Sequence, residues 1–336
     1  MNLPLSVLDL VPVGEGVSSG QAIQDSLRLA QELDRLGYER IWYAEHHNMP
    51  AIASTTPATM IALVAQQTRA IRVGAGGVML PNHAPLQVAE TFKMLESLHP
   101  GRIDLGIGRA PGTDQVTALA LRGSREALLA NDFPDKLSEL MEFGCGVRQQ
   151  HPFVGVTAFP DDVQLPPIWL LGSSDFSSAL AAQLGLGFAF AAHFSPDRPD
   201  RPMLGYREAF RAGALEVPHA ILAVSVVCSE TQAEAERLAS SMQLSWVRLR
   251  SGRPSKIPTP ETALSHSYSP QEAGALEAYR HMQIVGTPST VRERIEALAA
   301  RTRADEVMVT TITHDPAARL NSYRLLARAF DLSERR

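Results

Sequence analysis

Short apolar runs alternate with longer amphipathic segments from residue 5 to residue 330 of the chain. Apolar runs of this length fit buried strands, and apolar positions spaced three and four apart fit one face of a helix. Proline in the first turn or glycine just after the last turn marks several of these helices. We expect strands at residues 5–10, 40–44, 71–74, 102–106, 168–171, 187–191, 220–228 and 306–311. We expect helices at residues 21–36, 57–68, 85–98, 115–121, 135–148, 174–184, 202–212, 231–249, 288–300 and 316–330.

The order of these elements predicts the α/β class. Alternating strands and helices imply a parallel sheet with right-handed crossovers, and eight such units suit a closed (β/α)8 TIM barrel. The pattern is interrupted at 110–167, after the fourth strand, and at 251–283, after the helix that follows the seventh strand. No shift in composition marks a domain boundary, so we expect one barrel domain over residues 1–336 with two insertions.

Composition narrows the class of protein further. The chain is 45% hydrophobic and 20% charged, which is typical of a globular protein, and its net charge is −5 without a long basic run. The apolar stretch at 220–228 is far shorter than the ~20 residues that span a bilayer. The first ten residues do not resemble a signal peptide, and Cys145 and Cys228 stand far apart. We therefore expect a cytoplasmic protein that binds neither nucleic acid nor membrane and has no disulfide framework.

The chemistry of such a barrel lies at the carboxyl ends of its strands. Polar residues and glycines follow five of the predicted strands, at residues 45–48, 74–83, 108–112, 172–175 and 192–194. Function is therefore expected at this end of the barrel.

One of these segments has the pattern of an anion site. Gly172, Ser173 and Ser174 lead into a predicted helix, whose free N–H groups and dipole favour negative charge, and Ser177 lies one turn further on. Arg109 follows the neighbouring strand and can pair with a phosphate. The alternatives left open are an ordinary helix N-cap for the serines and a surface position for the arginine.

The adjacent His46 and His47 do not indicate a metal site. Neighbouring residues of an extended segment point in opposite directions, and no His-x-His or His-x-x-x-His pattern accompanies them. We expect one ring to face the barrel mouth as a proton donor or acceptor and the other to be packed. The glycines at 74–77 and 106–108 fail the pattern of a dinucleotide-binding motif, but they allow close approach by a flat ligand.

Four segments together resemble the bacterial-luciferase-like flavin-dependent monooxygenases. They read IWYAEHHN at 41–48, VGAGGVMLPNHAPLQVAE at 73–90, HPGRIDLGIGRAPG at 99–112 and LLGSSDFSSALAAQLGLG at 170–187. They occur in order at strand ends, and the resemblance covers nearly the whole chain. The pattern is most similar to the alkanal-monooxygenase-like branch of the family.

The resemblance implies a (β/α)8 barrel that binds FMN or, in some relatives, the deazaflavin F420. It implies that His46 lies near the flavin as the catalytic residue, and that a non-prolyl cis peptide lies beneath the flavin ring at Gly76–Gly77, with Ala75–Gly76 as the fallback. It also implies a homodimer formed through the helices at 57–68 and 85–98. The expected cofactor-binding residues are Ala75, Gly76, Gly77, Arg109, Gly172, Ser173, Ser174 and Ser177.

The chain also departs from the luciferase pattern. Gly108 stands where light-emitting luciferases have a cysteine, so bioluminescence is not implied. A second phosphate-binding arginine has no clear counterpart, and Lys136 is a weak candidate for its role. Ser173 replaces the acidic residue of the phosphate loop, which lessens repulsion of an anion.

We hypothesise a two-component monooxygenase that takes reduced FMN from a separate NAD(P)H-dependent flavin reductase and oxygenates a small organic substrate with O2. No NAD(P)H-binding motif occurs in the chain, and the two insertions are expected to shape the substrate entrance as lids. The alternatives are an F420-dependent hydride-transfer enzyme, a non-catalytic flavin-binding protein and an unrelated barrel enzyme acting on a sugar phosphate.

Overall fold

Eight parallel strands pair side by side and close on themselves, because the last of them pairs with both the first and the seventh. They are β1 (Leu5–Asp9), β2 (Arg40–Tyr43), β3 (Arg72–Met79), β4 (Ile103–Gly108), β5 (Ile168–Gly172), β6 (Gly187–Ala191), β7 (Ala220–Cys228) and β9 (Glu306–Thr310). The structure, a computed structural model, describes residues 3–147, 151–195 and 198–335. The predicted α/β class and (β/α)8 TIM barrel are confirmed.

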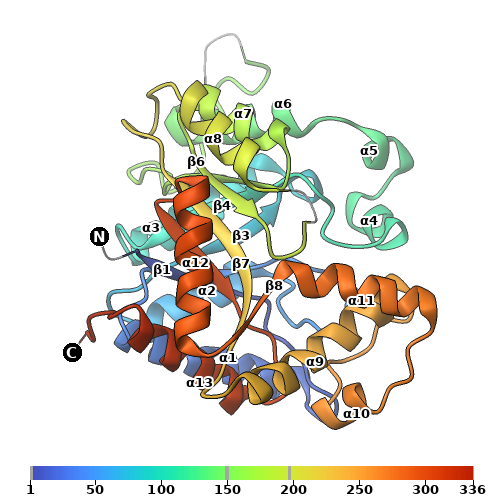
Figure 1. Cartoon of the computed structure of the whole chain (residues 1–336). Helices are drawn as coiled ribbons and strands as arrows, with labels where there is room; N and C mark the ends of the chain where they lie inside the picture. The colour runs from blue at the N-terminus through green and yellow to red at the C-terminus, as the bar shows by residue number, and fades with distance from the viewer. Residues whose placement is uncertain (1–2, 148–150, 196–197, 336) are drawn as a thin grey trace.

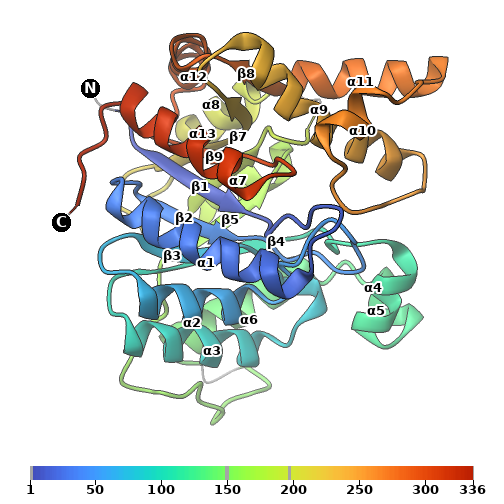
Figure 2. The same cartoon turned by 90° about the horizontal axis from the view of Figure 1, so that it is seen from below.

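Helices cover the outside of the barrel (Figures 1 and 2). They are α1 (Ser19–Arg35), α2 (Pro57–Gln67), α3 (Pro85–Leu98), α7 (Asp175–Leu184), α8 (Asp200–Ala209), α9 (Gln232–Arg250), α12 (Pro288–Thr302) and α13 (Pro316–Ala329). Every residue of β1, β7 and β9 is buried, which explains why these strands are continuous apolar runs. In the described part of the chain no helix is both long and apolar enough to cross a membrane.

The strand β3 is longer than the sequence predicted. It continues to Met79, whereas the predicted strand ended at residue 74. Its pairing with β4 shifts register between Ala75 and Val78, so the extra residues pass through an irregularity that alternation of polar and apolar residues does not reveal. Three glycines in this stretch further weaken the strand signal.

No helix or strand was predicted within the second insertion. It contains α10 (Pro260–Leu264) and α11 (Pro270–Met282), and it leads into a ninth strand, β8 (Gln283–Gly286). The helix α11 buries only Leu276 and Tyr279, so it has little apolar periodicity, although its N-terminus carries a capping box. β8 lies outside the closed barrel and pairs with the distal half of β7.

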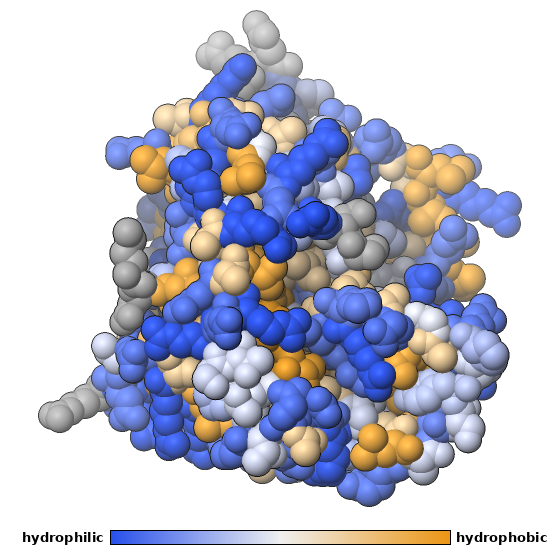
Figure 3. Space-filling model, viewed as in Figure 1, coloured by the Kyte–Doolittle hydropathy of each residue, from blue (hydrophilic) through white to orange (hydrophobic). Residues whose placement is uncertain are grey.

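The first insertion carries α4 (Gln115–Arg122), α5 (Arg125–Leu129) and α6 (Phe133–Cys145). The short helix α5 was not predicted, and the predicted end of α6 at residue 148 lies outside the described residues. The arm formed by α4 and α5 extends to the same side of the barrel as α10 and α11 (Figures 1 and 2). Val116 and Leu129 expose apolar side chains on this arm, which is partly orange in Figure 3.

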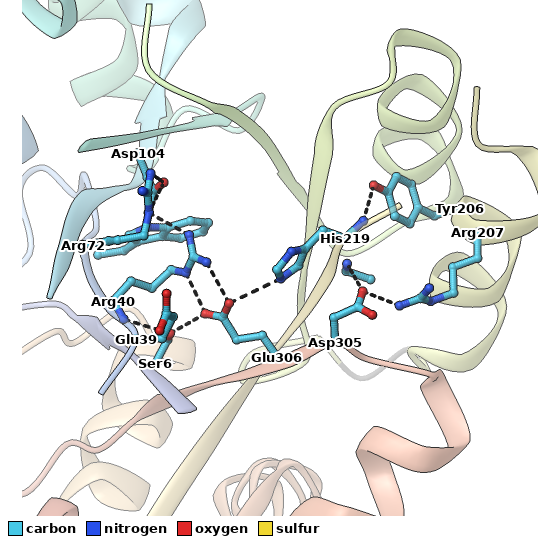
Figure 4. A network of polar contacts seen from close by, with 12 residues as sticks. Ser6, Glu39, Arg40, Arg72, Asp104, Tyr206, Arg207, His219, Asp305 and Glu306 are labelled. Atoms are coloured by element: carbon cyan, nitrogen blue, oxygen red, sulfur yellow. Dashed lines mark hydrogen bonds and ion pairs between the residues drawn. The ribbon is translucent and has the colours of Figure 1, made fainter. Parts of the chain in front are cut away.

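A buried ionic network fills the amino end of the barrel (Figure 4). Arg40, on β2, donates two hydrogen bonds to the carboxylate of Glu306, at 2.7 and 2.9 Å, and a third to Asp104 at 2.8 Å. Ser6 also donates to Glu306, and Arg72 donates to Asp104. These two arginines and two carboxylates balance in charge, which is the condition under which buried ions are tolerated.

Two tryptophans complete this network. The Arg40 guanidinium lies 4.9 Å from the ring centroid of Trp169 and 5.8 Å from that of Trp42, and the indole N–H of Trp42 donates to Asp104 at 3.0 Å. Burial alone would raise the pKa of Glu306, but the charge of Arg40 and the hydrogen bonds around the carboxylate lower it. The amino end of the barrel is therefore closed by paired side chains.

Candidate active site

The end of β4 meets the start of α7 through one aromatic contact. Arg109 directly follows β4, and its guanidinium lies 4.4 Å from the ring centroid of Phe176 in the first turn of α7. The two segments meet because β4 and β5 are neighbours in the barrel and α7 follows β5. Both side chains are exposed. The cation is therefore held beside a helix N-terminus while its N–H groups remain available to an anion.

The serines at this helix start keep their hydroxyls free. Ser174 occupies the N-cap position of α7, yet its side chain makes no capping hydrogen bond. Nor does the Ser173 or Ser177 hydroxyl find a hydrogen-bond partner among residues 3–147, 151–195 and 198–335. A Cβ atom on Gly172 would lie 2.4 Å from Ser177 Oγ, so the strand end must be glycine for Ser177 to occupy its place. Ser174 therefore does not act as an ordinary N-cap, which was the alternative interpretation of these serines.

Two other charged groups near the site are already paired. Asp175, in the first turn of α7, forms an ion pair with Arg201 at 3.2 Å. Lys136, the weak candidate for a second phosphate cation, donates to the Pro81 carbonyl at 2.9 Å and lies 3.5 Å from Asp132. Arg109 is consequently the cation best placed to meet an anion at this helix.

The segment after Ala75 consists of two glycines, so it carries backbone without side chains into the barrel. The peptide bond Gly76–Gly77 is cis, as predicted. A Cβ on Gly77 would lie 2.7 Å from the Gly106 carbonyl oxygen. A Cβ on Gly106 would lie 2.0 Å from the Ala75 carbonyl oxygen. The backbones of β3 and β4 therefore touch here, and only glycine allows the contact.

His46 follows β2 and is held by one hydrogen bond. Its Nδ1 lies 3.1 Å from the Gly112 carbonyl oxygen. Because a carbonyl only accepts, Nδ1 carries the hydrogen and Nε2 keeps a free lone pair. Burial lowers the pKa of His46 more than the nearby charge of Glu45 raises it. The ring is therefore a neutral acceptor at neutral pH, suited to take up a proton.

The second histidine of the pair belongs to a different cluster. The buried carboxylate of Glu45 accepts hydrogen bonds from His47 at 3.0 Å, from His83 at 2.9 Å and from the Met79 backbone N–H at 2.9 Å. Burial would raise the pKa of Glu45, but His83 and these other donors lower it. The cluster fastens the end of β2 to the end of β3. The residues described include no group of three or more side chains suited to hold a metal ion.

Another histidine, which was not among the predicted site residues, also lies at the barrel mouth. His193 follows β6, and its ring lies near the backbone of Ala223 on β7. Its Nδ1 is buried without a partner in the described residues. Burial, together with the nearby His46, lowers the pKa of His193 to about 4. The signal available in the sequence was its position two residues after a predicted strand.

A groove of about 810 Å³ runs along α2 and α3, and Glu45 and His83 are among its lining residues. Its walls include Leu63 and Met94, and Met94 is 58% exposed. The two helices lie side by side in Figure 2. This is the face predicted to form a homodimer.

The sequence of the chain is similar to proteins of known family. The sequence model of the luciferase-like monooxygenases matches residues 3–306. A luciferase-like monooxygenase of Escherichia coli (strain K12) is 41% identical over 333 residues, which cover 99% of this chain and 97% of that protein. An N-acetyl-S-alkylcysteine monooxygenase of Bacillus subtilis (strain 168) is 33% identical, with 97% of each chain covered.

Solved structures agree with the fold. The crystal structure of apo-MsnO8 is 39% identical to this chain, with a TM-score of 0.89 over 99% of both chains. Two more distant structures share the fold alone. One is the oxygenating constituent of 3,6-diketocamphane monooxygenase from Pseudomonas putida in complex with FMN, at 19% identity and TM-score 0.70 over 98% of this chain and 97% of that one. The other is an F420-dependent secondary alcohol dehydrogenase with an F420-acetone adduct, at 11% identity and TM-score 0.70 over 98% and 99%.

Proposed function

Because this chain belongs to the luciferase-like monooxygenase family, we propose that it uses reduced FMN and O2 to oxygenate a small organic substrate. We propose further that it obtains reduced FMN from a separate NAD(P)H-dependent flavin reductase. Relatives of this family carry names that fit such a reaction, including the N-acetyl-S-alkylcysteine monooxygenase of Bacillus subtilis and the FMN complex from Pseudomonas putida.

The observation that carries this proposal is the cluster of hydrogen-bond donors at the start of α7. It combines one cation, Arg109, with the free hydroxyls of Ser173, Ser174 and Ser177 and the unpaired N–H groups of a helix N-terminus. These donors suit a phosphate monoester such as that of FMN. F420 carries a longer anionic tail, which would need further cations. Among the described residues, Arg201 is already paired to Asp175, and Lys136 is paired to Asp132 and to a backbone carbonyl.

The other predicted residues complete a site for a flat ring. Ala75, Gly76 and Gly77 offer backbone with little side chain, and Gly172 leaves room for Ser177. The bound flavin supplies the electrons and the activation of O2. His46, neutral and with its Nε2 lone pair free, accepts a proton or a hydrogen bond at the barrel mouth. Since both insertions extend to one side of the barrel, they shape the entrance and help exclude water.

We also propose a homodimer formed through α2 and α3. Exposed apolar side chains at Leu63, Met94 and Leu98 support it, because a second copy would remove them from water. The partner would also cover the groove that Glu45 and His83 help to line. A single domain over residues 1–336 and a cytoplasmic location remain our predictions.

Side-by-side anaerobic titration of reduced FMN, oxidised FMN and F420 tests the cofactor. Turnover is then measured with FMN, an added flavin reductase, NADH and 18O2 against a panel of aldehydes, ketones and thioethers. We expect tighter binding of reduced FMN than of F420, and one 18O atom in the product of at least one substrate class. Tighter binding of F420, or hydrogen peroxide as the sole product across the panel, would contradict the proposal.

A further inference from the structure

Met79, the last residue of β3, fills the space that a side chain at position 108 would take. Met79 pairs with Gly108 across β3 and β4. A Cβ on Gly108 would lie 2.8 Å from Met79 Sδ and 3.0 Å from Met79 Cε. The thioether of Met79 therefore lies directly over Gly108, at the end of β4.

Alternation along both strands places this thioether on the inner side of the barrel wall. Val78 belongs to the core that packs against the helices and lines the groove along α2 and α3, so Met79 points the opposite way. On β4, Ile107 belongs to the same outer core, which turns Gly108 inward. Met79 is half-buried. Its sulfur and terminal methyl group therefore lie at the mouth of the barrel.

The same side chain lies beside the loop that anchors His46. A Cβ on Gly112 would lie 3.1 Å from Met79 Cγ, and the Gly112 carbonyl oxygen lies 3.1 Å from His46 Nδ1. The Met79 backbone N–H donates to Glu45 at 2.9 Å, which fixes the end of β3 while the side chain stays free to change rotamer. Methionine is unbranched and adapts its shape to a neighbouring group. Met79 is therefore an adaptable apolar side chain next to the candidate catalytic histidine.

The inner wall near this position is apolar. Leu10 and Leu171 are partly buried and pack against the inner cluster of the barrel, whose smallest members are alanines. A Cβ on Gly77 would lie 2.2 Å from Leu171 Cδ1, so Leu171 reaches the strand that carries Met79. An apolar wall favours an alkyl group over a charged one, because burying a charge without a partner is costly.

We infer that Met79 is a specificity-determining residue, whose thioether limits the length of the alkyl group that a substrate can carry. This inference rests on the proposed function. Removal of Cγ, Sδ and Cε would extend the apolar space by about two methylenes, and each methylene buried there adds about fourfold in affinity. A side chain of similar volume would keep the limit unchanged.

Variants of two residues separate the volume of Met79 from its sulfur. Met79→Ala removes the volume, whereas Met79→Leu keeps most of the volume and removes the sulfur. Gly108→Ala, added to Met79→Ala, places a methyl group beside the vacated thioether position and so refills part of the space. Met282→Ala is the matched control, because Met282 is also half-buried but lies at the end of α11.

The test is calorimetric binding of two probes, 2-hexanone and 2-octanone, to each protein after saturation with oxidised FMN, so that no turnover is needed. We expect Met79→Ala to bind 2-octanone about tenfold more tightly than wild type does, and 2-hexanone within about twofold. Met79→Leu and Met282→Ala should bind both probes as wild type does. The double variant should lose about threefold of the gain for 2-octanone.

The outcomes are distinct. If the protein binds no FMN, the proposed function fails and this inference fails with it. If FMN binds and Met79→Ala gains nothing for 2-octanone, or neither ketone binds, the proposed function stands and the role of Met79 is overturned. An equal gain in Met79→Leu would also overturn it, because the volume at the mouth is then nearly unchanged. Thermal denaturation of each variant confirms that the protein tested is folded.

Discussion

The guanidinium of Arg109 lies 4.4 Å from the ring centroid of Phe176, and this contact joins the end of β4 to the first turn of α7. An exposed arginine usually samples many rotamers, and the aromatic face reduces that freedom. The arginine is thus oriented toward the helix start before a ligand arrives. Preorganisation of this kind lowers the entropic cost of binding.

Arg109→Ala should weaken FMN binding about 10- to 100-fold, because a charge-assisted hydrogen bond is worth about 1.5–3 kcal/mol. Phe176→Ala should weaken it about two- to fivefold, since it only releases the arginine. Calorimetric titration with reduced FMN measures both. Arg69→Ala is the control, because Arg69 is an exposed arginine just before β3, at the opposite end of the barrel. Equal affinity of Arg109→Ala and Arg69→Ala would exclude Arg109 from the phosphate site.

Gly172→Ala should lower FMN affinity without unfolding the barrel. The added methyl would sit 2.4 Å from Ser177 Oγ, so the hydroxyl must move. Gly274→Ala provides the comparison, because a Cβ at this position in α11 meets nothing within 4 Å and alanine is favoured in a helix by about 1 kcal/mol. We expect Gly274→Ala to bind FMN as wild type does. Unchanged affinity in Gly172→Ala would show that Ser177 does not contact the cofactor.

Arg40→Met should destabilise the protein by about 3–5 kcal/mol, because it leaves the buried carboxylates of Glu306 and Asp104 without their shared cation. Arg324→Met removes a half-exposed partner of Glu32 and should cost less than about 1 kcal/mol. Urea denaturation gives both free energies of unfolding. A loss below about 1 kcal/mol in Arg40→Met would mean that the network contributes little net stability.

The lowered pKa of His193 predicts loss of stability in mild acid. The folded chain keeps this ring neutral down to a pKa of about 4, whereas the unfolded chain protonates it near 6.5. Below pH 6.5 the unfolded state therefore binds more protons, and stability falls as pH falls toward 4. Between pH 7.5 and pH 5 this group alone should cost about 2 kcal/mol. His193→Gln should lose correspondingly less stability over that interval, as measured by urea denaturation at both values. Parallel losses in the two proteins would refute the shift.

Met94→Glu should convert the proposed dimer to a monomer, because it places a charge on the exposed apolar face of α2 and α3. Sedimentation velocity measures the change. Val116→Glu alters a similarly exposed apolar residue, on α4, and should leave the oligomeric state unchanged. A wild-type protein that sediments as a monomer would remove the basis of this prediction.

The barrel could be predicted from the sequence because its strands are buried on both faces and separated by amphipathic helices. The insertion elements could not, since α11 buries only two residues and β8 is four residues long. Such elements form because a neighbouring surface offers them partners, in this case the distal half of β7. Their own sequence carries little periodic signal.

Some relationships in the candidate site could also be predicted from the sequence, and others could not. The convergence of Arg109 with the serines of α7 follows from the adjacency of two strands, which the order of elements already implies. The contact of Glu45 with His83 joins residues 38 positions apart, and the charge of His46 lowers the pKa of His193, which follows a strand that is not a neighbour of β2. Those relationships depend on side-chain direction across the barrel, which no spacing along the chain specifies.

The side chains of Arg40, Glu306 and Asp104 occupy the amino end of the barrel, so that end offers a ligand no entrance. Under the proposed function, cofactor and substrate would both enter, and product would leave, at the carboxyl end. The ligand that binds deeper would then arrive first and depart last. Turnover on this scaffold is consequently expected to follow a compulsory order, visible in the pattern of product inhibition.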